Sequence, residues 1–478
     1  MAKGKKKKFM LTSFSIIMLI IIFLAVLSHL LPGAQFVGEE LVNGSGVTGA
    51  KVSDVLLAPI LGFADAVDVA IFIIMLGGLL KVVENTNALE TGIKVLIKKL
   101  KGKELMLIPI LMFIFSIAGT TYGMLEETVA FYALLAATMV MVGMDTIVAS
   151  ATVLLGAGVG VLGSTINPFA VGAAVSALPE GIQANQGLII GMGAVLWILS
   201  YIIATAFVMK YAEKVKKDKG STFLSLREQK NMEKKFLKEK DEKEVSLTTK
   251  QKVTLVLFGF AFLVMILGFI PWGEFGITMP SFTGFLTGAV LGDWWFYEAA
   301  AWFLVISIII AVVNKTGEKN FVDVFVDGAD DMLGVIMIIA VARGASVLMG
   351  VTHLDNYLIY NAAELLKNMP AVLYAPLNYL LHVVLSILVP SSSGIATLST
   401  PIMAPLTQTL GFSVETNIMI LVAANGLVNL ITPTCGAIMG GLALAKVEYS
   451  TWFKWSFKVV LSLAAVSIIV LTFFMCIL

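Results

Sequence analysis

The sequence predicts an all-α polytopic membrane protein with about nine transmembrane helices plus two re-entrant hairpins, arranged in inverted repeats. Three observations predict this class. Of the 478 residues, 58% are hydrophobic and only 14% are charged, whereas a soluble globular domain carries about 25% charged residues. Apolar runs recur, each close to the roughly 20 residues that cross the hydrocarbon of a bilayer. Two of these runs are broken by polar strings at corresponding places in the two halves of the chain.

The first predicted span is an apolar run that follows a basic N-terminal patch, residues 1–8. This run is longer than the roughly 7–15-residue core of a secretory signal, so we expect an uncleaved span. The full set of predicted spans is 9–31, 66–84, 146–177, 187–213, 252–270, 295–313, 329–350, 413–443 and 455–477.

Two further apolar stretches, 105–142 and 371–411, each have a small, polar centre, at 116–123 and 390–394 respectively. Each arm is barely long enough to cross a bilayer, and neither centre carries Lys or Arg. We therefore interpret both stretches as re-entrant hairpins. The alternative is an ordinary exposed loop between two spans.

Lysine and arginine are sorted by loop. In the predicted layout most of them fall on one side, and the loops of the other side hold only Lys51 and Lys367. We expect a multi-pass protein of a bacterial plasma membrane, and the positive-inside rule predicts a cytoplasmic N-terminus and an external C-terminus. The net charge of +1 gives no indication of a nucleic-acid partner.

The chain divides into a first transmembrane half at 1–209, a charged linker at 210–252 and a second transmembrane half at 253–478. The linker is dense in Lys and Glu with almost no aromatic residues. We expect it to be a solvated, helical, cytoplasmic segment. A regulatory or partner-binding segment is the alternative.

The two halves can be matched. Residues 64–86 correspond to 329–352, and each is followed by an amphipathic stretch (88–100 and 354–366), then by a hairpin and a broken helix. In the predicted topology the two hairpins enter the membrane from opposite sides. The repeat is therefore inverted, which is the arrangement used for alternating access in many transporters.

The breaks are Gly-Ser-Thr-Ile-Asn-Pro at 163–168 and Ile-Thr-Pro-Thr-Cys-Gly at 431–436. Proline removes a backbone donor, and unsatisfied backbone is costly in hydrocarbon, so such a break needs protein or a watery cavity around it. Paired broken helices point to the substrate site of a secondary transporter, although a single kink could simply ease helix packing. The candidate substrate-binding residues of the strings are Ser164, Thr165, Asn167, Thr432 and Thr434. Three of them, Ser164, Asn167 and Thr432, offer the hard oxygen ligands of a candidate Na⁺ site.

The hairpin tips add a second set of candidates. A helix N-terminus that points to the midplane offers free N–H groups and a positive dipole end, which suit a substrate carboxylate. The candidate substrate-binding residues at the tips are Thr120, Thr121 and Tyr122 from the first hairpin and Ser391, Ser392 and Ser393 from the second.

Three charged residues lie within apolar segments and are candidates for coupling or charge pairing. Glu126 and Glu127 are adjacent, so they point about 100° apart on a helix. We expect one to face the site as a proton carrier or partner of a cationic group and the other to cap a helix, unless both are caps. Arg343 either holds a substrate carboxylate or ties its helix to Asp330, Glu126 or a carbonyl group. Helix capping is expected for the aspartates near predicted helix starts: Asp65, Asp68, Asp327, Asp330 and Asp331.

Enzyme signatures are absent from the sequence. It contains no HExxH, GxSxG or P-loop motif and no cluster of Cys and His. With only Cys435 and Cys476 there is no disulfide framework. We therefore expect a secondary carrier with no cofactor, coupled to a proton or Na⁺. A channel would share the spans but does not need two closed hairpins, and a membrane enzyme would need catalytic groups that the sequence lacks.

These motifs resemble the C4-dicarboxylate anaerobic carrier family, and more closely its YfcC-type branch, within the ion-transporter superfamily. The resemblance covers nearly the whole chain. It rests on the Gly-Thr-Thr-Tyr-Gly-Met-Leu-Glu-Glu-Thr hairpin, the Gly-Ser-Thr-Ile-Asn-Pro break, the Ala-Arg-Gly at 342–344 and the Pro-Ser-Ser-Ser-Gly hairpin. It implies a homodimer, with a scaffold domain and a transport domain that carries both hairpins and moves like an elevator.

The resemblance leaves two substrate classes. The family name implies a C4-dicarboxylate, whereas members of the YfcC-type branch are commonly described as amino-acid carriers, including arginine–ornithine exchangers. Glu126 and Glu127 favour a zwitterion or cation, because carboxylates repel a dianion in a low dielectric. We therefore expect a symporter or exchanger for a basic amino acid, with a C4-dicarboxylate carrier as the alternative. In the sodium symporters of the superfamily a Ser-Asn-Thr string holds Na⁺, and the matching positions 164–167 and 432–434 depart from that pattern.

Overall fold

The computed structural model describes residues 13–478 except 38–39, 43, 93–94, 96–101, 238–245 and 271. The basic patch 1–8, part of the amphipathic stretch 88–100 and part of the linker 210–252 lie outside the described residues. The described chain is mainly helical. It also contains a small antiparallel pair of strands after the first helix, β1 (Phe36–Val37) and β2 (Glu40–Leu41).

The helices follow the predicted order of two halves. The first half contains α1 (Ser13–Leu30), α2 (Val52–Asp65), α3 (Val67–Asn85), α5 (Leu107–Tyr122), α6 (Val129–Met141), α7 (Thr146–Leu162), α8 (Ala173–Ser176) and α9 (Gln186–Lys217). The linker contributes α10 (Leu226–Phe236). The second half contains α11 (Thr249–Phe269), α12 (Phe296–Asn314), α13 (Glu318–Thr352), α14 (Leu354–Leu366), α15 (Ala371–Leu388), α16 (Ser392–Thr409), α17 (Val414–Val428), α18 (Gly436–Ala445) and α19 (Tyr449–Ile477).

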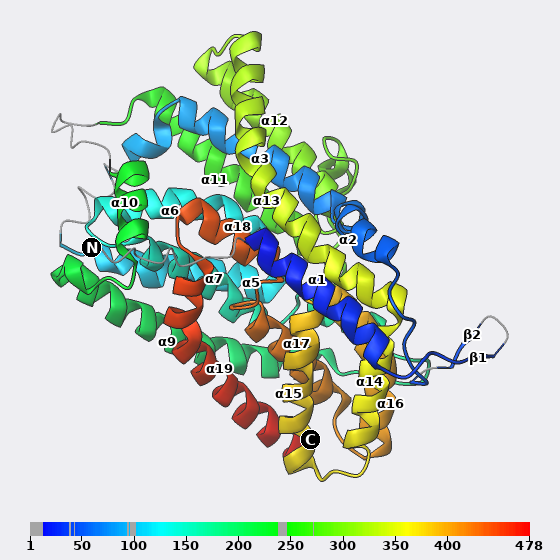
Figure 1. Cartoon of the computed structure of the whole chain (residues 1–478). Coiled ribbons are helices and arrows are strands. Elements are labelled where there is room, and N and C mark those ends of the chain that lie inside the picture. The colour runs from blue at the N-terminus through cyan, green and yellow to red at the C-terminus, as the bar shows by residue number, and fades with distance from the viewer. Residues whose placement is uncertain are drawn as a thin grey trace, which may run out of the picture.

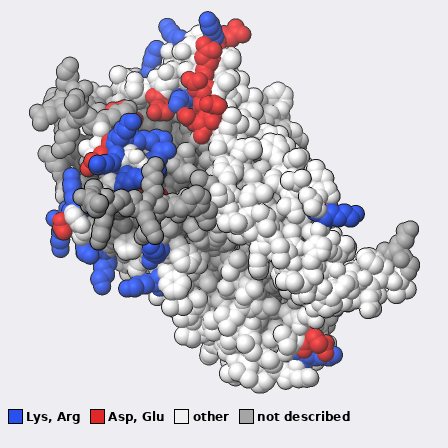
Figure 2. Space-filling view, in the orientation of Figure 1, with Lys and Arg blue, Asp and Glu red and all other residues white. Residues whose placement is uncertain are grey.

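The prediction of an all-α polytopic membrane protein is confirmed. Among the described residues, 7 helices are long and apolar enough to cross a membrane, or up to 8 if α2 and α3, which meet at a 59° bend, form one span. The predicted spans 146–177 and 413–443 are each divided by a break, into α7 with α8 and α17 with α18. Charged side chains gather towards one end of the molecule in Figure 2, and a broad uncharged surface covers the middle, as expected for a lipid-facing belt.

The two halves repeat one packing pattern. In each half, a helical hairpin (α5 and α6, or α15 and α16) packs on the helix that precedes the break, α7 or α17. That helix also packs against the last helix of its half, α9 or α19, and α7 and α17 contact one another at the centre (Figure 1). These elements form the first of two helix groups, which we call the hairpin group.

The second helix group, the α13 group, consists of α1, α2, α3, α11, α12 and α13. The long helix α13 packs along α1, α2 and α3 (Figure 1). Glycines allow these helices to approach closely: a Cβ on Gly62 of α2 would overlap the carbonyl oxygen of Ala340 in α13, and one on Gly344 would lie 2.7 Å from the carbonyl oxygen of Ala58. Small residues at helix crossings are the usual means of close packing in membranes.

Helix α13 begins at Glu318, eleven residues before the predicted span at 329–350. Asp327, Asp330 and Asp331 therefore lie inside a helix, so the expectation that they cap its start is wrong. The reason is that a hydropathy pattern marks only the apolar section of a helix, and this helix continues beyond it with charged turns. Asp331 makes an ion pair of 2.8 Å with Lys81 of α3.

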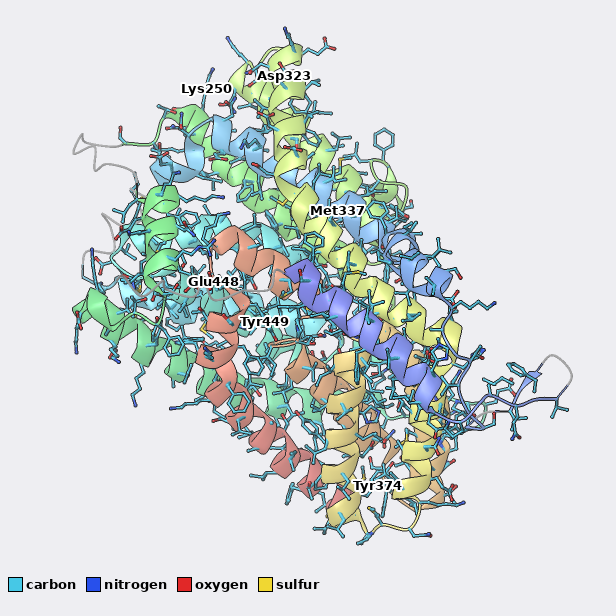
Figure 3. The ribbon with its side chains drawn as sticks, viewed as in Figure 1. Lys250, Asp323, Met337, Tyr374, Glu448 and Tyr449 are labelled. Atoms are coloured by element: carbon cyan, nitrogen blue, oxygen red, sulfur yellow. The ribbon has the colours of Figure 1, made fainter. Side chains whose placement is uncertain are left out.

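Most described residues of the linker are exposed, and Thr222 and Glu228 attach the segment to the membrane helices. Glu228 of α10 is only 1% exposed. Its carboxylate accepts hydrogen bonds from the backbone N–H of Glu448 (2.8 Å) and the hydroxyl of Thr451 (3.1 Å) at the start of α19, near the labelled Glu448 in Figure 3. Nearby, the hydroxyl of Thr222 donates to Asp145 (2.6 Å), the N-cap residue of α7. Tertiary contacts, which composition does not reveal, therefore position this segment.

Candidate functional site

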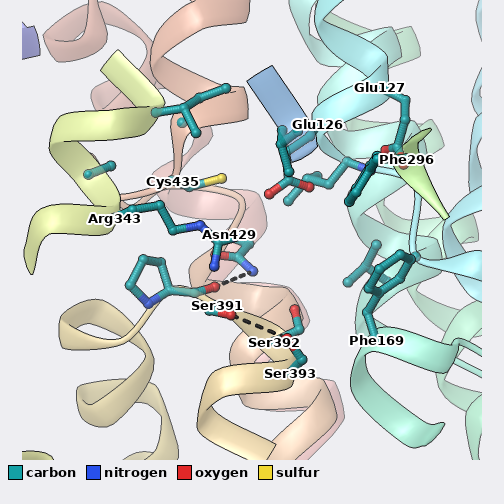
Figure 4. Close-up of a pocket in the computed structure, with 18 of the residues that line it drawn as sticks. Glu126, Glu127, Phe169, Phe296, Arg343, Ser391, Ser392, Ser393, Asn429 and Cys435 are labelled. Carbon is teal, nitrogen blue, oxygen red and sulfur yellow. Dashed lines mark hydrogen bonds between the residues drawn. The ribbon is translucent and has the colours of Figure 1, made fainter. Parts of the chain in front are cut away.

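A pocket of about 260 Å³ lies where the two broken helices meet the tips of both hairpins and α13 (Figure 4). Its lining includes residues of both breaks, so the two polar strings meet at one cavity. The polar residues that line it are Asp65, Asp68, Glu126, Glu127, Asn167, Arg343, Ser391, Ser392, Ser393, Asn429, Thr434 and Cys435.

The first break is organised by Asn167. Its side-chain oxygen accepts hydrogen bonds from the backbone N–H groups of Phe169 (2.9 Å) and Ala170 (3.3 Å), and its amide nitrogen donates to the hydroxyl of Ser164 (2.9 Å). The chain then restarts as a π-helical turn with proline at its first position, where a missing N–H costs nothing. Asn167 thus caps the turn from the wall of the pocket.

The second break is organised by two threonines on either side of Pro433. The hydroxyls of Thr432 and Thr434 lie 2.7 Å apart, and Thr434 also donates to the carbonyl oxygen of Ile387 at the end of α15 (3.0 Å). Cys435 follows as the N-cap residue of α18 and is 4% exposed. This break is therefore fastened to the second hairpin, and Thr434 and Cys435 reach the pocket.

The start of α16 forms one wall. Ser391 is its N-cap residue and accepts a hydrogen bond from the N–H of Gly394 (3.1 Å). Ser392 and Ser393 occupy the first helical positions, whose N–H groups have no carbonyl partner within a helix. This wall therefore presents donors and the positive end of an 18-residue helix.

Two asparagines one turn apart support this wall: Asn425 in α17 and Asn429, the C-cap residue of that helix. The hydroxyl of Ser392 donates to the side-chain oxygen of Asn425 (2.7 Å), and the amide nitrogen of Asn429 donates to the same oxygen (3.1 Å) and to the carbonyl oxygen of Pro390 (3.4 Å). Sequence reasoning missed both. The signal that could have found them is a pair of amides spaced i, i+4 within the predicted span 413–443, just before the second break.

The opposite side of the pocket is acidic. The chain turns after α5 at Gly123, whose φ of 80° favours glycine, and Glu126 then projects into the pocket across from the three serines (Figure 4). Glu127 is 1% exposed, and its carboxylate accepts a hydrogen bond from the N–H of Leu125 (3.0 Å). The two adjacent glutamates therefore differ, with Glu126 directed to the cavity and Glu127 bonded to the turn.

Arg343 of α13 also reaches the pocket and makes an ion pair with Asp65 of α2 at 3.6 Å. The expected partners were Asp330, Glu126 or a carbonyl group, and Asp65 was expected to cap a helix. Asp68 accepts hydrogen bonds from the indole N–H of Trp295 (3.0 Å) and from the N–H of Val69 (2.8 Å). The α13 group thus contributes two carboxylates and one guanidinium to the site.

Aromatic rings complete the wall that faces α12. The ring of Phe169 packs on those of Trp295 (4.6 Å between centroids) and Phe296 (5.9 Å). All three line the pocket, and sequence reasoning named none of them. They provide an apolar surface beside the charged groups, suited to the methylene chain of a ligand.

Three predicted tip residues do not line this pocket, because α5 continues through Tyr122 and the chain turns only at Gly123. The hydroxyl of Thr120 donates to the carbonyl oxygen of Gly163 (2.6 Å), and that of Thr121 donates to Ile117 within the same helix (2.7 Å). Tyr122 is buried and stacks on Phe269 of α11 at 5.4 Å. In this structure Thr120 braces the first break, and Thr121 and Tyr122 face away from the cavity lining.

Ser164, Thr165 and Thr432 also lie outside the pocket lining. Ser164 donates to the carbonyl oxygen of Val161 (2.6 Å), and Thr165 donates to that of Thr120 (3.0 Å). The candidate Na⁺ ligands were Ser164, Asn167 and Thr432. Ser164 and Asn167 are hydrogen-bonded to each other, and Thr432 is hydrogen-bonded to Thr434. A Na⁺ ion at these residues stays a prediction.

The family model of the DcuC C4-dicarboxylate anaerobic carriers matches residues 10–476 of this chain. The chain belongs to this family. It is therefore a membrane transporter. The assignment to this family that the sequence motifs predicted is confirmed.

Two relatives are similar along most of the chain. An uncharacterised protein of Haemophilus influenzae is 30% identical over 405 residues, which cover 84% of this chain and 74% of the relative. A protein of Escherichia coli named "Putative basic amino acid antiporter YfcC" is 25% identical over 405 residues, which cover 82% of this chain and 74% of the relative.

Two solved structures of transporters are similar over nearly the whole chain. The Alcanivorax borkumensis YdaH transporter has a TM-score of 0.47 and 15% identity, with 97% of this chain and 98% of that chain covered. Neisseria gonorrhoeae MtrF, described within a class of antimetabolite efflux pumps, has a TM-score of 0.45 and 13% identity, with 98% and 96% covered.

Proposed function

We propose that this protein is a secondary active exchanger for amino acids with a cationic side chain, of the arginine and ornithine kind. The observation that carries the proposal is the polarity of the pocket. One wall is the start of α16 with three serines, and Glu126 lies across from it. A helix N-terminus suits an α-carboxylate, and a carboxylate in a partly apolar cavity suits a cation.

The charge of the pocket supports the same substrate class. Four carboxyl groups line it, from Asp65, Asp68, Glu126 and Glu127, against the single guanidinium of Arg343. Because Asp65 already pairs with Arg343, the pocket keeps an excess of carboxyl groups, which disfavours a second anionic group of a ligand. The name of the Escherichia coli relative, a basic amino acid antiporter, agrees with this class.

Alternating access would move the hairpin group relative to the α13 group. The pocket lies at their boundary. The hairpins and breaks line one side, and Asp65, Asp68, Arg343 and Phe296 are among the residues that line the other. An elevator-like displacement would therefore separate a bound ligand from the α13 side while keeping it on Ser391–Ser393 and Glu126. The concentration of basic residues near α9 and α10 supports a cytoplasmic position for that end of the molecule (Figure 2).

The test is counterflow in proteoliposomes made with the purified protein. Vesicles loaded with unlabelled L-ornithine should take up labelled L-arginine several times faster than empty vesicles, and vesicles loaded with succinate should not. Imposed Na⁺ or proton gradients, applied in turn, identify a coupling ion. Absence of amino-acid exchange would contradict the proposal.

A C4-dicarboxylate carrier is the second candidate, since the description of the family favours it. A dicarboxylate that bound its first carboxylate at the start of α16 would place its second one near Glu126. Succinate–fumarate exchange that L-arginine does not inhibit would establish this candidate in place of the first.

A further inference from the structure

The side-chain oxygen of Asn429 has no hydrogen-bond donor among the residues that the structure describes, although Asn429 is only 3% exposed. Asn429 lines the pocket beside the start of α16. A buried amide oxygen without a donor is destabilising, because it loses its hydrogen bonds to water and gains none in return. Such an acceptor at the edge of a pocket is available to a donor group of a ligand.

The hydrogen-bond network determines which way this amide points. The carbonyl oxygen of Pro390 can only accept, and the amide nitrogens of Asn425 (3.5 Å) and Asn429 (3.4 Å) both donate to it. The side-chain oxygen of Asn425 in turn accepts from Ser392 and from Asn429. Turning the amide of Asn429 around would place its oxygen against two other acceptors, so the oxygen must be the atom left without a partner.

Donors lie next to this acceptor. Ser392 is bonded to Asn425 and contributes, with Ser393, the unpaired N–H groups at the start of α16. An acceptor beside a set of donors complements a ligand that carries an ammonium group next to a carboxylate. An α-amino acid has these two groups on one carbon atom. A dicarboxylate has no donor to offer.

We propose that Asn429 determines specificity for α-amino acids: its side-chain oxygen accepts a hydrogen bond from the α-ammonium group while the start of α16 holds the α-carboxylate. This inference rests on the proposed function and adds to it. In the proposed function, Glu126 recognises the cationic side chain of the amino-acid substrate, and Asn429 recognises its α-ammonium group. Asn429 then excludes ligands that carry the cationic side chain and the carboxylate without the α-amino group.

The test compares inhibitors of L-arginine exchange in proteoliposomes. L-Arginine and 5-guanidinopentanoate differ only in the α-amino group. On the wild-type protein the second should inhibit about 10- to 100-fold more weakly, the range for a hydrogen bond to a charged group. In Asn429→Ala and Asn429→Leu the two should inhibit within about threefold of one another, because the partner of the α-amino group is gone.

Asn417→Ala is the matched control. Asn417 is a buried asparagine of α17, the helix that ends just before Asn429. Its side-chain oxygen accepts a hydrogen bond from the amide nitrogen of Asn378 (2.8 Å), and it does not line the pocket. This variant should keep the wild-type ratio between the two inhibitors even if its stability falls. A ratio that falls as far in Asn417→Ala as in Asn429→Ala would overturn the proposal.

The comparison of the two inhibitors on the wild-type protein tests the role of Asn429 even if both Asn429 variants fail to fold. Equal inhibition of wild-type exchange by L-arginine and 5-guanidinopentanoate would overturn the role of Asn429 and leave the proposed function standing. Absence of exchange with L-arginine, L-lysine and L-ornithine would overturn both.

Discussion

At the scale of single residues, the adjacent carboxylates of Glu126 and Glu127 point in different directions because the chain turns just before them. Glu126 projects into the pocket, whereas Glu127 is buried and accepts a hydrogen bond from the N–H of Leu125. Glycine at position 123 allows the tight turn that produces this difference. We therefore expect the substitution of glutamine for glutamate to have different effects at the two positions.

Glu126→Gln should reduce exchange of L-arginine by about 10- to 100-fold, because it removes the charged partner of the cationic side chain. Glu127→Gln should remain close to the wild type, since an amide oxygen can still accept from Leu125. Initial rates of counterflow at matched amounts of protein in the vesicles measure both. The opposite pattern, with only Glu127→Gln inactive, would show that the buried glutamate carries the substrate or proton charge.

Cys435 reports directly on the second break, since it lines the pocket and is 4% exposed. A small methanethiosulfonate reagent should modify it in a Cys476→Ser background, and saturating L-arginine should slow that reaction, by occupying the cavity or by shifting the population of open states. Mass spectrometry after timed quenching gives the rate. Labelling at one rate with and without every transported substrate would place the break outside the substrate path.

At the scale of elements, close helix packing depends on glycines at the crossings. Gly62 of α2 faces the backbone of α13 around Ala340, and Gly77 of α3 faces Gly328. The hairpin group uses the same device, since a Cβ on Gly119 of α5 would overlap the carbonyl oxygen of Ala157 in α7. The position of Arg343 and Asp65 in the pocket therefore depends on how closely α2 and α13 approach.

Gly62→Ala should lower the thermal unfolding temperature in detergent, because the added methyl group overlaps backbone atoms and overpacking costs about 1–3 kcal/mol. Gly334→Ala is the matched control: it lies in α13, and a Cβ there meets nothing within 4 Å. Because alanine favours helix over glycine by about 1 kcal/mol, this control should be neutral or stabilising. Equal losses in the two variants would contradict the importance of the α2–α13 approach.

At the scale of the whole molecule, the pocket lies at the boundary of the hairpin group and the α13 group, and the linker packs on the hairpin group. Asp145, Thr222 and Glu228 connect the linker to α7 and α19. The described part of the linker, including α10, should therefore move with the hairpins and breaks when the protein changes state.

Glu228→Ala should release α10 from α19, because Glu448 and Thr451 lose their shared acceptor. Limited proteolysis should then cut within residues 218–236 several times faster than in the wild type. Glu233→Ala, at an exposed position of the same helix, is the control and should leave the rate unchanged. Similar rates for the two variants would mean that other contacts hold the linker.

The sequence by itself determined the class of fold, the order of the elements and the positions of both breaks. These features depend on local physics: hydrophobic length, proline, and small or polar residues that interrupt an apolar run. It also identified Glu126, Asn167, Arg343, Thr434 and the serines 391–393, all of which line the pocket, because polar groups in apolar segments are conspicuous.

Only the tertiary structure decided which candidates share a cavity. Asp65, Glu126, Arg343, Ser392 and Asn429 come from five distant segments, and no local pattern relates them. The ion pair of Arg343 with Asp65, the aromatic wall at Phe169 and the support of Ser392 by Asn425 all arise from helix crossings. Thr120, Tyr122 and Thr432 have the same local character as the lining residues, yet they point into packed protein. Their difference follows from the direction of each side chain on its helix, which depends on how the helices pack.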